Sequence, residues 1–547
     1  MAIFKRLSSF VILAVLWQLS FAQTNTIPRS NPAQEGVEAK AVLQLYTSLM
    51  SLEQTEIHHV VVMRHGKVIS ELHPAPFRAI DAHTLYSASK TFCSMAVGLC
   101  IDDNRLRVTD RVATFFPEFL PDTISDGLAK MTVHDLLTMS SGIIPDWNMR
   151  SITTEWEKTW LAKHLKYEPG EKFLYDSMST YMLSAIVQKV TGHTVLQLLQ
   201  ERIFAPLGIT EAEWEQSARG VNTGGWGMRI QAESEAKFGQ LLLQKGNWNG
   251  KQLISREWID RATQCHKVPF TDNPKKNIQN PGYGYQLWLC EIPGSFCADG
   301  ALGQYIFVVP EKDMVVVLNG ASMKGYEEID ATFRFIKQVA TDNGPLKFDA
   351  AQQKALDKFT ASASQRTVKG VKVKAKPSIA LHDGFALQFG TDGNLQYTFD
   401  GRTITAAPAQ WHYASSTVQP PYSIHPKSMF KGLNKPFTTA ARYSWENRDK
   451  LVINTYWVDF ISGETVTVEF DKATKKAHVS VKRNFTSTPA ANLTLPYTPQ
   501  NKLQLIKYYY VPNCLYTGCR CYAAHCVQFY GKPCSRASKH GARPHCA

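Results

Sequence analysis

The most reactive pattern in the sequence is a serine and a lysine three residues apart. Ser87 and Lys90 stand in the stretch Ser-Ala-Ser-Lys, where the apolar pattern predicts the start of a buried helix. Residues three apart on a helix share one face, about one turn apart. A lysine in that position can take the proton of the serine if burial or nearby cations lower its pKa from the ordinary ~10.4. The pair therefore indicates a serine nucleophile with a lysine base.

Two further segments carry groups that such chemistry needs. Tyr175 and Ser177 end a loop that leads into an apolar helix. The tyrosine could carry a proton, and the serine could hydrogen-bond the lysine or the substrate. Asp299, Gly300, Ala301 and Gln304 belong to a glycine-containing edge just before a predicted strand over 305–309, and all four are candidate substrate or oxyanion residues. At such an edge, backbone N–H groups can face a ligand without obstruction from side chains, as an oxyanion hole requires.

Each of these patterns also has a purely structural interpretation. Ser87 could be the N-cap of a core helix, and Ser428 with Lys431 makes a second match to the same short pattern in a strand-rich region. Tyr175 could pack at a helix start, and the glycine edge could be a plain hairpin start. The chain contains neither a G-x-S-x-G elbow nor an H-E-x-x-H helix. The combination and order of the three segments, more than any one of them, favour catalysis.

The elements around these segments predict an α/β domain over residues 35–341. Hairpins are expected at both ends, around residues 59–72 and 305–318. Helical periodicity dominates between them, and a last helix is expected over 326–339. Strands at both ends around a helical middle indicate a sheet built from both ends of the domain, with a helical insertion. The helices expected in the middle cover residues 87–101, 131–140, 179–191 and 233–245.

A second body follows this domain. Residues 342–378 read as a linker, residues 379–500 as an antiparallel β domain, and residues 501–547 as a cysteine-rich tail. The chain of 547 residues has a net charge of +13. Residues 341–547 hold 27 basic and 12 acidic side chains, whereas residues 1–340 hold 33 and 35. The catalytic segments therefore need no nucleic-acid partner. The basic region could contact a cell wall or another polyanion, or be only a solvated face.

The first 22 residues predict export. Lys5 and Arg6 precede an apolar stretch over 10–17, and small residues at Ser20 and Ala22 predict a signal peptide cleaved before Gln23. The apolar stretch is short for a membrane anchor, which needs about 20 residues. We therefore expect a secreted or periplasmic protein with no stable membrane span after cleavage.

Eleven cysteines in an exported chain permit disulfides. Cys290 and Cys297 flank a Pro-Gly turn and could form a bridge, whereas Cys93 and Cys100 lie in a helical pattern and are expected to be buried thiols. Six more cysteines crowd the tail, where disulfides or disorder are favoured over zinc because no C-x-x-C pair is present. We expect no metal at the catalytic site.

The order of the motifs resembles the serine β-lactamase-related hydrolases. This family includes class C β-lactamases, penicillin-binding DD-peptidases, related esterases and 6-aminohexanoate-dimer hydrolase, and the motifs are most similar to the last two. The resemblance spans residues 35–341. Besides S-x-x-K and Tyr-x-Ser, it rests on the stretches TVHDLLTMSSG at 132–142, GWGMR at 225–229, AKFGQ at 236–240 and GYGYQLW at 282–288.

The resemblance implies a mechanism. Ser87 would form an acyl-enzyme, Lys90 and Tyr175 would relay protons, and the backbone N–H groups of Ser87 and Ala301 would hold the oxyanion. No metal or organic cofactor is implied. The fold would be that of β-lactamases and transpeptidases, an antiparallel sheet flanked by helices with a helical insertion, followed here by the smaller β domain.

One departure from the family pattern affects the expected substrate. Relatives that bind β-lactams usually carry a cation where this chain has Ala298 and Asp299, and an aspartate repels an anion. We therefore expect an amide, peptide or ester substrate, neutral or amine-bearing. The alternatives are activity on β-lactams or peptidoglycan, or a non-catalytic protein that binds peptidoglycan or a partner.

Overall fold

The computed structural model describes residues 26–269, 279–341, 344–365, 370–374 and 376–499. By their contacts, the described residues belong to one compact unit. The predicted signal peptide and the cysteine-rich tail lie outside the described residues. Among the described residues, no helix is both long and apolar enough to cross a membrane.

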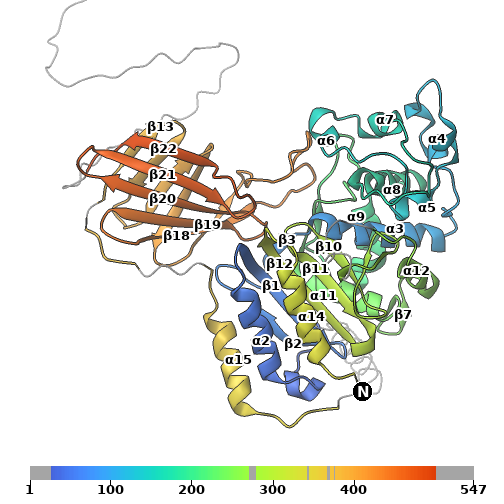
Figure 1. The fold of residues 1–547 in the computed structure, drawn as a ribbon, viewed down its shortest axis with the longest axis horizontal. Coiled ribbons are helices and arrows are strands. Elements are labelled where there is room, and N and C mark those ends of the chain that lie inside the picture. Colours follow the sequence, from blue (N-terminus) through green and yellow to red (C-terminus); the bar gives the residue numbers. More distant parts are fainter. Residues whose placement is uncertain (1–25, 270–278, 342–343, 366–369, 375, 500–547) are drawn as a thin grey trace, which may run out of the picture. The chain divides into compact units, whose positions relative to one another are not determined.

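A seven-stranded antiparallel sheet organises the first domain (Figure 1). β1 pairs with β12 along nine registered positions, which joins the two ends of the domain in the middle of the sheet. The two predicted hairpins are therefore confirmed as neighbours. The sheet has the order β2 (Lys67–Leu72), β1 (Thr55–Arg64), β12 (Met314–Ser322), β11 (Gln304–Val309), β10 (Phe296–Gly300), β9 (Trp288–Leu289) and β8 (Gly282–Tyr283).

Helices cover both faces of this sheet, so its central strands read as almost continuous apolar runs. Alternate residues of β1 contribute to two separate cores: Val61 and Met63 to one, Val60 and Val62 to the other. The first core contains α11 (Ala232–Leu243) and α3 (Ser89–Asp102). The second contains α2 (Ala39–Met50) and α14 (Glu327–Gln338), which contact each other (Figure 1).

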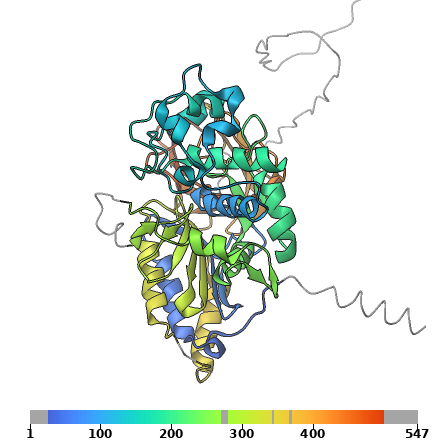
Figure 2. The ribbon, with the colours of Figure 1, turned by 90° about the vertical axis from the view of Figure 1, so that its right-hand side faces the viewer.

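Most of the helices that lie between β2 and β8 in the sequence gather beyond one end of the sheet, whereas α11 packs on its face (Figures 1 and 2). The longest of these helices, α8, begins after Asp176, whose carboxylate accepts hydrogen bonds from the N–H groups of Met178 and Ser179, and ends at Gly192 in the left-handed conformation. The helix expected over 131–140 is shorter than predicted. The remaining helices are α4 (Asp126–Lys130), α5 (Val133–Leu137), α6 (Met149–Ile152), α7 (Trp156–Leu161), α8 (Ser177–Thr191), α9 (Val195–Leu199), α10 (Ala205–Leu207) and α12 (Arg256–Ala262).

The small strands of this region form two further sheets. β3 (Ala82–Thr84), β5 (Met228–Gln231) and β4 (Glu213–Trp214) form one of three strands. β6 (Asn247–Trp248) and β7 (Lys251–Gln252) form a hairpin.

The C-terminal body is antiparallel, as the alternating strands predict, and it forms an almost closed barrel. Its ends meet at one bridge, where Ser378 and Thr498 exchange backbone hydrogen bonds of 3.0 and 2.8 Å. Among the described strands of this body, β16 and β18 pair in parallel, at residues 407–408 and 442–443, and the others pair antiparallel. The strands are β13 (Ile379–His382), β14 (Phe385–Phe389), β15 (Leu395–Phe399), β16 (Arg402–Pro408), β17 (His412–Ser416), β18 (Phe437–Trp445), β19 (Lys450–Trp457), β20 (Gly463–Asp471), β21 (Lys476–Arg483) and β22 (Ala491–Pro496).

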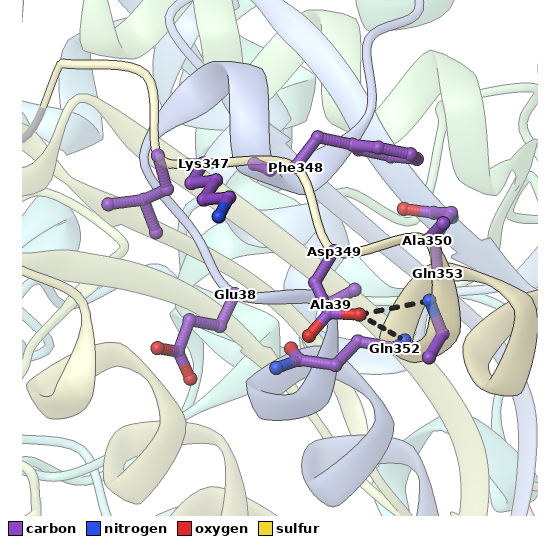
Figure 3. Close-up of a pocket in the computed structure, with 11 residues that line it drawn as sticks. Glu38, Ala39, Lys347, Phe348, Asp349, Ala350, Gln352 and Gln353 are labelled. Carbon is purple, nitrogen blue, oxygen red and sulfur yellow. Dashed lines mark hydrogen bonds between the residues drawn. The ribbon is translucent and has the colours of Figure 1, made fainter.

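The segment between the two bodies contains a helix where the sequence suggested only a linker. α15 (Ala350–Ser362) is capped by Asp349, whose carboxylate accepts from two backbone N–H groups of the first turn (Figure 3). The side chain of Gln352 also accepts a hydrogen bond from the N–H of Lys40 in α2, at 3.1 Å. The groove at this junction, about 650 Å³, contains none of the predicted site residues.

Cys290 and Cys297 do not form the bridge that the sequence permits. Both are free, buried thiols. In the strands, Cys297 pairs with Trp288 and the N–H of Cys290 donates to the carbonyl of Ser295, so the two cysteines are not directly opposite each other. Their thiols are nevertheless in hydrogen-bond contact. Cys93 and Cys100 are buried free thiols, as predicted.

Candidate active site

Ser87 lies in a 3-10 turn that connects β3 to α3. The turn spans Tyr86–Ala88, and Tyr86 adopts a positive φ of 45°, a strained conformation for a non-glycine residue. A backbone hydrogen bond fixes the chain before this turn, because the N–H of Leu85 donates to the carbonyl of Met228 at 2.9 Å. Ser87 alone among residues 83–90 is not fully buried. The turn thus presents one hydroxyl from an otherwise buried stretch.

Lys90 contacts three other groups of the site. Its Nζ is hydrogen-bonded to Ser87 Oγ at 2.9 Å, to Ser177 Oγ at 3.0 Å and to the carbonyl of Gly225 at 2.7 Å. The residue is only 1% exposed. Burial and the positive charge of Arg150 lower the pKa of Lys90 to about 7. A substantial fraction of Lys90 is therefore neutral at neutral pH and able to accept a proton.

Tyr175 lies against the same pair. Its ring centroid is 4.8 Å from Lys90 Nζ, and its hydroxyl interacts with Ser87. Phe173, Tyr283 and Trp288 surround the ring. This apolar setting raises the pKa of Tyr175, so the phenol stays protonated at neutral pH and can act as a proton donor.

Gly300 brings the end of β10 against the Ser87 turn. A Cβ at this position would lie 2.1 Å from the carbonyl oxygen of Leu85 and 3.1 Å from the backbone nitrogen of Ala88. Only glycine permits this approach without a shift of the backbone. Asp299 and Ala301, on either side of it, both line the pocket that contains Ser87.

Gln304 lies behind the turn that follows Gly300 and stabilises it. It is fully buried, and its Nε2 donates to the carbonyls of Ala301, Leu302 and Gly320 at 3.3, 3.1 and 2.8 Å. The side chain thus braces the turn after Gly300 and does not line the pocket with Ser87.

The pocket at Ser87 measures about 700 Å³ and is strongly aromatic. Most of its lining residues have no role that the sequence motifs indicate. Trp226 and Trp288 stand within motif stretches, which is a signal that could have marked them, whereas nothing in the sequence pointed to Arg150. The lining residues with no predicted role include Tyr86, Trp147, Arg150, Phe173, Trp226, Trp288, Ser423, Ile424 and Phe485.

The last three of these belong to the C-terminal body. The loop over 417–436, between β17 and β18, is bonded to the first domain at several points. Tyr86 OH and Ser423 Oγ share a hydrogen bond of 2.7 Å, next to the nucleophile candidate. The N–H of Lys427 donates to the carbonyl of Arg150 at 2.9 Å, and the N–H of Gln216 to that of Lys431 at 2.7 Å. The C-terminal body therefore supplies part of the pocket wall.

The predicted residues thus divide into three groups. The structure brings Ser87, Lys90, Tyr175 and Ser177 into direct contact. It places Asp299, Gly300 and Ala301 beside them, and Gln304 behind the turn. Within the described part of the chain, no cluster of three or more metal-ligating side chains occurs.

A sheet flanked by helices, with a serine–lysine pair at the start of a buried helix, defines the class of protein. Comparison with known families agrees: the beta-lactamase family matches residues 54–341, more than half of the chain. The chain belongs to this family, whose members are serine hydrolases that act on amide and ester bonds.

Individual relatives are distant. A 6-aminohexanoate-dimer hydrolase of Paenarthrobacter ureafaciens is 25% identical over 323 residues, which cover 54% of this chain and 81% of that protein. A lovastatin esterase of Penicillium rubens is 27% identical over 25% of this chain and 41% of its own length. An octameric penicillin-binding protein homologue of Pyrococcus abyssi has 16% identity and a TM-score of 0.44, covering 80% of this chain and 96% of its own.

Proposed function

We propose that this protein is an exported serine hydrolase that cleaves an amide, peptide or ester bond through an acyl-enzyme on Ser87. The observation that carries the proposal is the contact between Ser87 Oγ and a buried Lys90 whose pKa is lowered to about 7. A lysine in this state can take the hydroxyl proton at physiological pH. The N-terminal charged and apolar stretches support export.

The proposed reaction has two halves. In the first, Ser87 Oγ attacks the carbonyl carbon while Lys90 takes its proton, and backbone N–H groups at Ser87 and Ala301 stabilise the oxyanion. The tetrahedral adduct collapses when the bond to the leaving group breaks, and the leaving group takes a proton from Tyr175, which Lys90 reprotonates. In the second, a water molecule gives a proton to the same relay and attacks the acyl carbon. The bond between the acyl carbon and Ser87 Oγ then breaks, and the relay returns the proton to Oγ, which releases the acid and restores Ser87.

The substrate class rests on the relatives and on the pocket. The two curated relatives are named for an amide-linked dimer and for an ester, and Asp299 lines the pocket where β-lactam-binding relatives carry a cation. A panel of p-nitrophenyl esters, ω-amino amides, D-amino-acid peptides and nitrocefin tests the proposal. We expect ester or amide turnover that is lost in Ser87→Ala. Rapid nitrocefin turnover with inert esters and amides would contradict the substrate class. A complete lack of turnover would favour a binding protein.

The lowered pKa of Lys90 predicts the pH profile. The neutral lysine is the base, so kcat/KM should rise with pH through about 7 and level off above it. Glu215, also with a pKa near 7, is buried in the same region. Glu215→Gln is therefore the control and should leave the midpoint in place. An activity that falls as the pH rises through 7 would show that the protonated lysine is the active form.

A further inference from the structure

Arg150 is a buried cation in the wall of the pocket that contains Ser87. It belongs to the short helix α6 and is 9% exposed. The C-terminal body holds the backbone of Arg150 in place, because the carbonyl of Arg150 accepts a hydrogen bond of 2.9 Å from the N–H of Lys427. Its guanidinium lies 4.9 Å from the ring centroid of Trp226 and 5.4 Å from that of Trp147. Two aromatic rings therefore hold the cation at the pocket.

The guanidinium has no acceptor of its own. Across the described ranges, no hydrogen bond or ion pair is made by its side chain, and Nε is buried without a partner. Burying a donor of this kind without an acceptor is costly, and the rigid fork of arginine matches a carboxylate in two-point contact. A carboxylate in the pocket would supply an acceptor that the described side chains do not.

The neighbouring acidic groups do not fill this role. Asp176 is occupied as the cap of α8 and as the acceptor for Trp160 Nε1 at 3.0 Å. Glu215 is fully buried, and burial raises its pKa to about 7, so it is neutral for much of the time at neutral pH. Glu215 forms no ion pair with Arg150 in the described structure. Tyr422, a third neighbour, is kept neutral because burial raises its pKa.

We propose that Arg150 is the anion subsite of the pocket and that the natural substrate carries a carboxylate, which the guanidinium binds while the scissile carbonyl lies at Ser87. The flanking rings of Trp147 and Trp226 offer apolar surface to the carbon chain between the two groups. This inference rests on the proposed function and names its substrate class. It replaces the expectation of a neutral or amine-bearing substrate, which considered Asp299 alone.

Matched ester pairs test the subsite. Two series of p-nitrophenyl or aryl esters are compared. In one series the acyl side carries a terminal carboxylate, and in the other the leaving-group side carries it. Each compound is paired with the methyl ester of that terminal carboxylate. Rates are measured well above the midpoint of each variant's pH profile, so that Lys90 is neutral throughout. We expect the wild type to prefer the carboxylate member of one series. Arg150→Gln should lower kcat/KM for that member by about 10- to 100-fold and for its methyl ester by less than about threefold.

Two control variants sharpen the comparison. Arg150→Lys keeps the positive charge but loses the planar two-point geometry of the guanidinium, so it should recover part of the preference for the carboxylate ester. Arg334→Gln, at an exposed arginine of α14, should change neither member. If Arg150→Gln does not fold, the charge preference of the wild type and its competitive inhibition by free alkanoates, compared with the matching amides, decide the question.

Three results would overturn the inference: a wild type that prefers the methyl esters, no preference in either series, or equal losses for both members in Arg150→Gln. The last result would make Arg150 a structural residue. None of these affects the proposed function, which fails instead if the wild type hydrolyses no ester or amide at all.

Discussion

Lys90→Met is expected to lower kcat/KM for ester or amide hydrolysis by about 10³-fold, within the range for removal of a positioned general base. Methionine keeps most of the length of the side chain but cannot accept the proton of Ser87. The substitution also leaves the carbonyl of Gly225 and the hydroxyl of Ser177 without the amine that now contacts both. The loss should fall mainly on kcat, since Lys90 touches the nucleophile and does not line the pocket.

A matched control is present in the same chain. Ser428 and Lys431 repeat the serine–lysine spacing, but the Nζ of Lys431 is bonded to the carbonyl of Ala218 on the surface. Lys431→Met should therefore leave kcat/KM within about twofold of the wild type. If Lys90→Met retained more than a tenth of the activity, Lys90 could not be the base.

Gly300→Ala is expected to lower both activity and stability. The new methyl group would lie 2.1 Å from the carbonyl oxygen of Leu85, so β10 or the Ser87 turn must move. Insertion of an extra methyl group into a packed site costs about 1–3 kcal/mol in the free energy of unfolding. Because the same shift separates the backbone N–H groups of Ser87 and Ala301, kcat should fall by about 10²-fold or more.

The expected loss of activity and stability in Gly300→Ala arises from lack of space for the methyl group. A glycine with open space around it is therefore the control. A Cβ on Gly344 would meet nothing within 4 Å, so Gly344→Ala should leave kcat and the denaturation midpoint near the wild-type values. Wild-type activity in Gly300→Ala would mean that the end of β10 does not lie against the nucleophile turn during catalysis.

The sequence predicts the contact between Ser87 and Lys90 because it depends on local spacing on one face of a turn and helix. Tyr175 and Ser177 are predicted from the order of the motifs, since Ser177 reaches Lys90 across 87 positions. The sequence predicts that the two ends of the domain share one sheet, since apolar hairpins flank the helical region. It does not predict the register of β1 against β12, because that register depends on how two cores pack on opposite faces of the sheet.

The rest of the pocket depends on contacts between residues far apart in the sequence. Ser423 reaches Tyr86 across 337 positions, and no periodicity in the strand-rich region indicates this. Arg150 stands in a short helix with no motif around it, so only its burial between Trp147 and Trp226 reveals it. Gln304 was predicted as a site residue from its place beside the glycine edge, whereas its side chain is occupied by three carbonyls of the neighbouring backbone.

The most direct test of the account is the mass of the protein during turnover. The enzyme is mixed with an activated ester, quenched in acid within the first turnovers and digested, and the peptides are analysed by mass spectrometry. We expect one added acyl group on the peptide that contains Ser87, and none in Ser87→Ala. Turnover with no adduct, or an adduct on another residue, would contradict it.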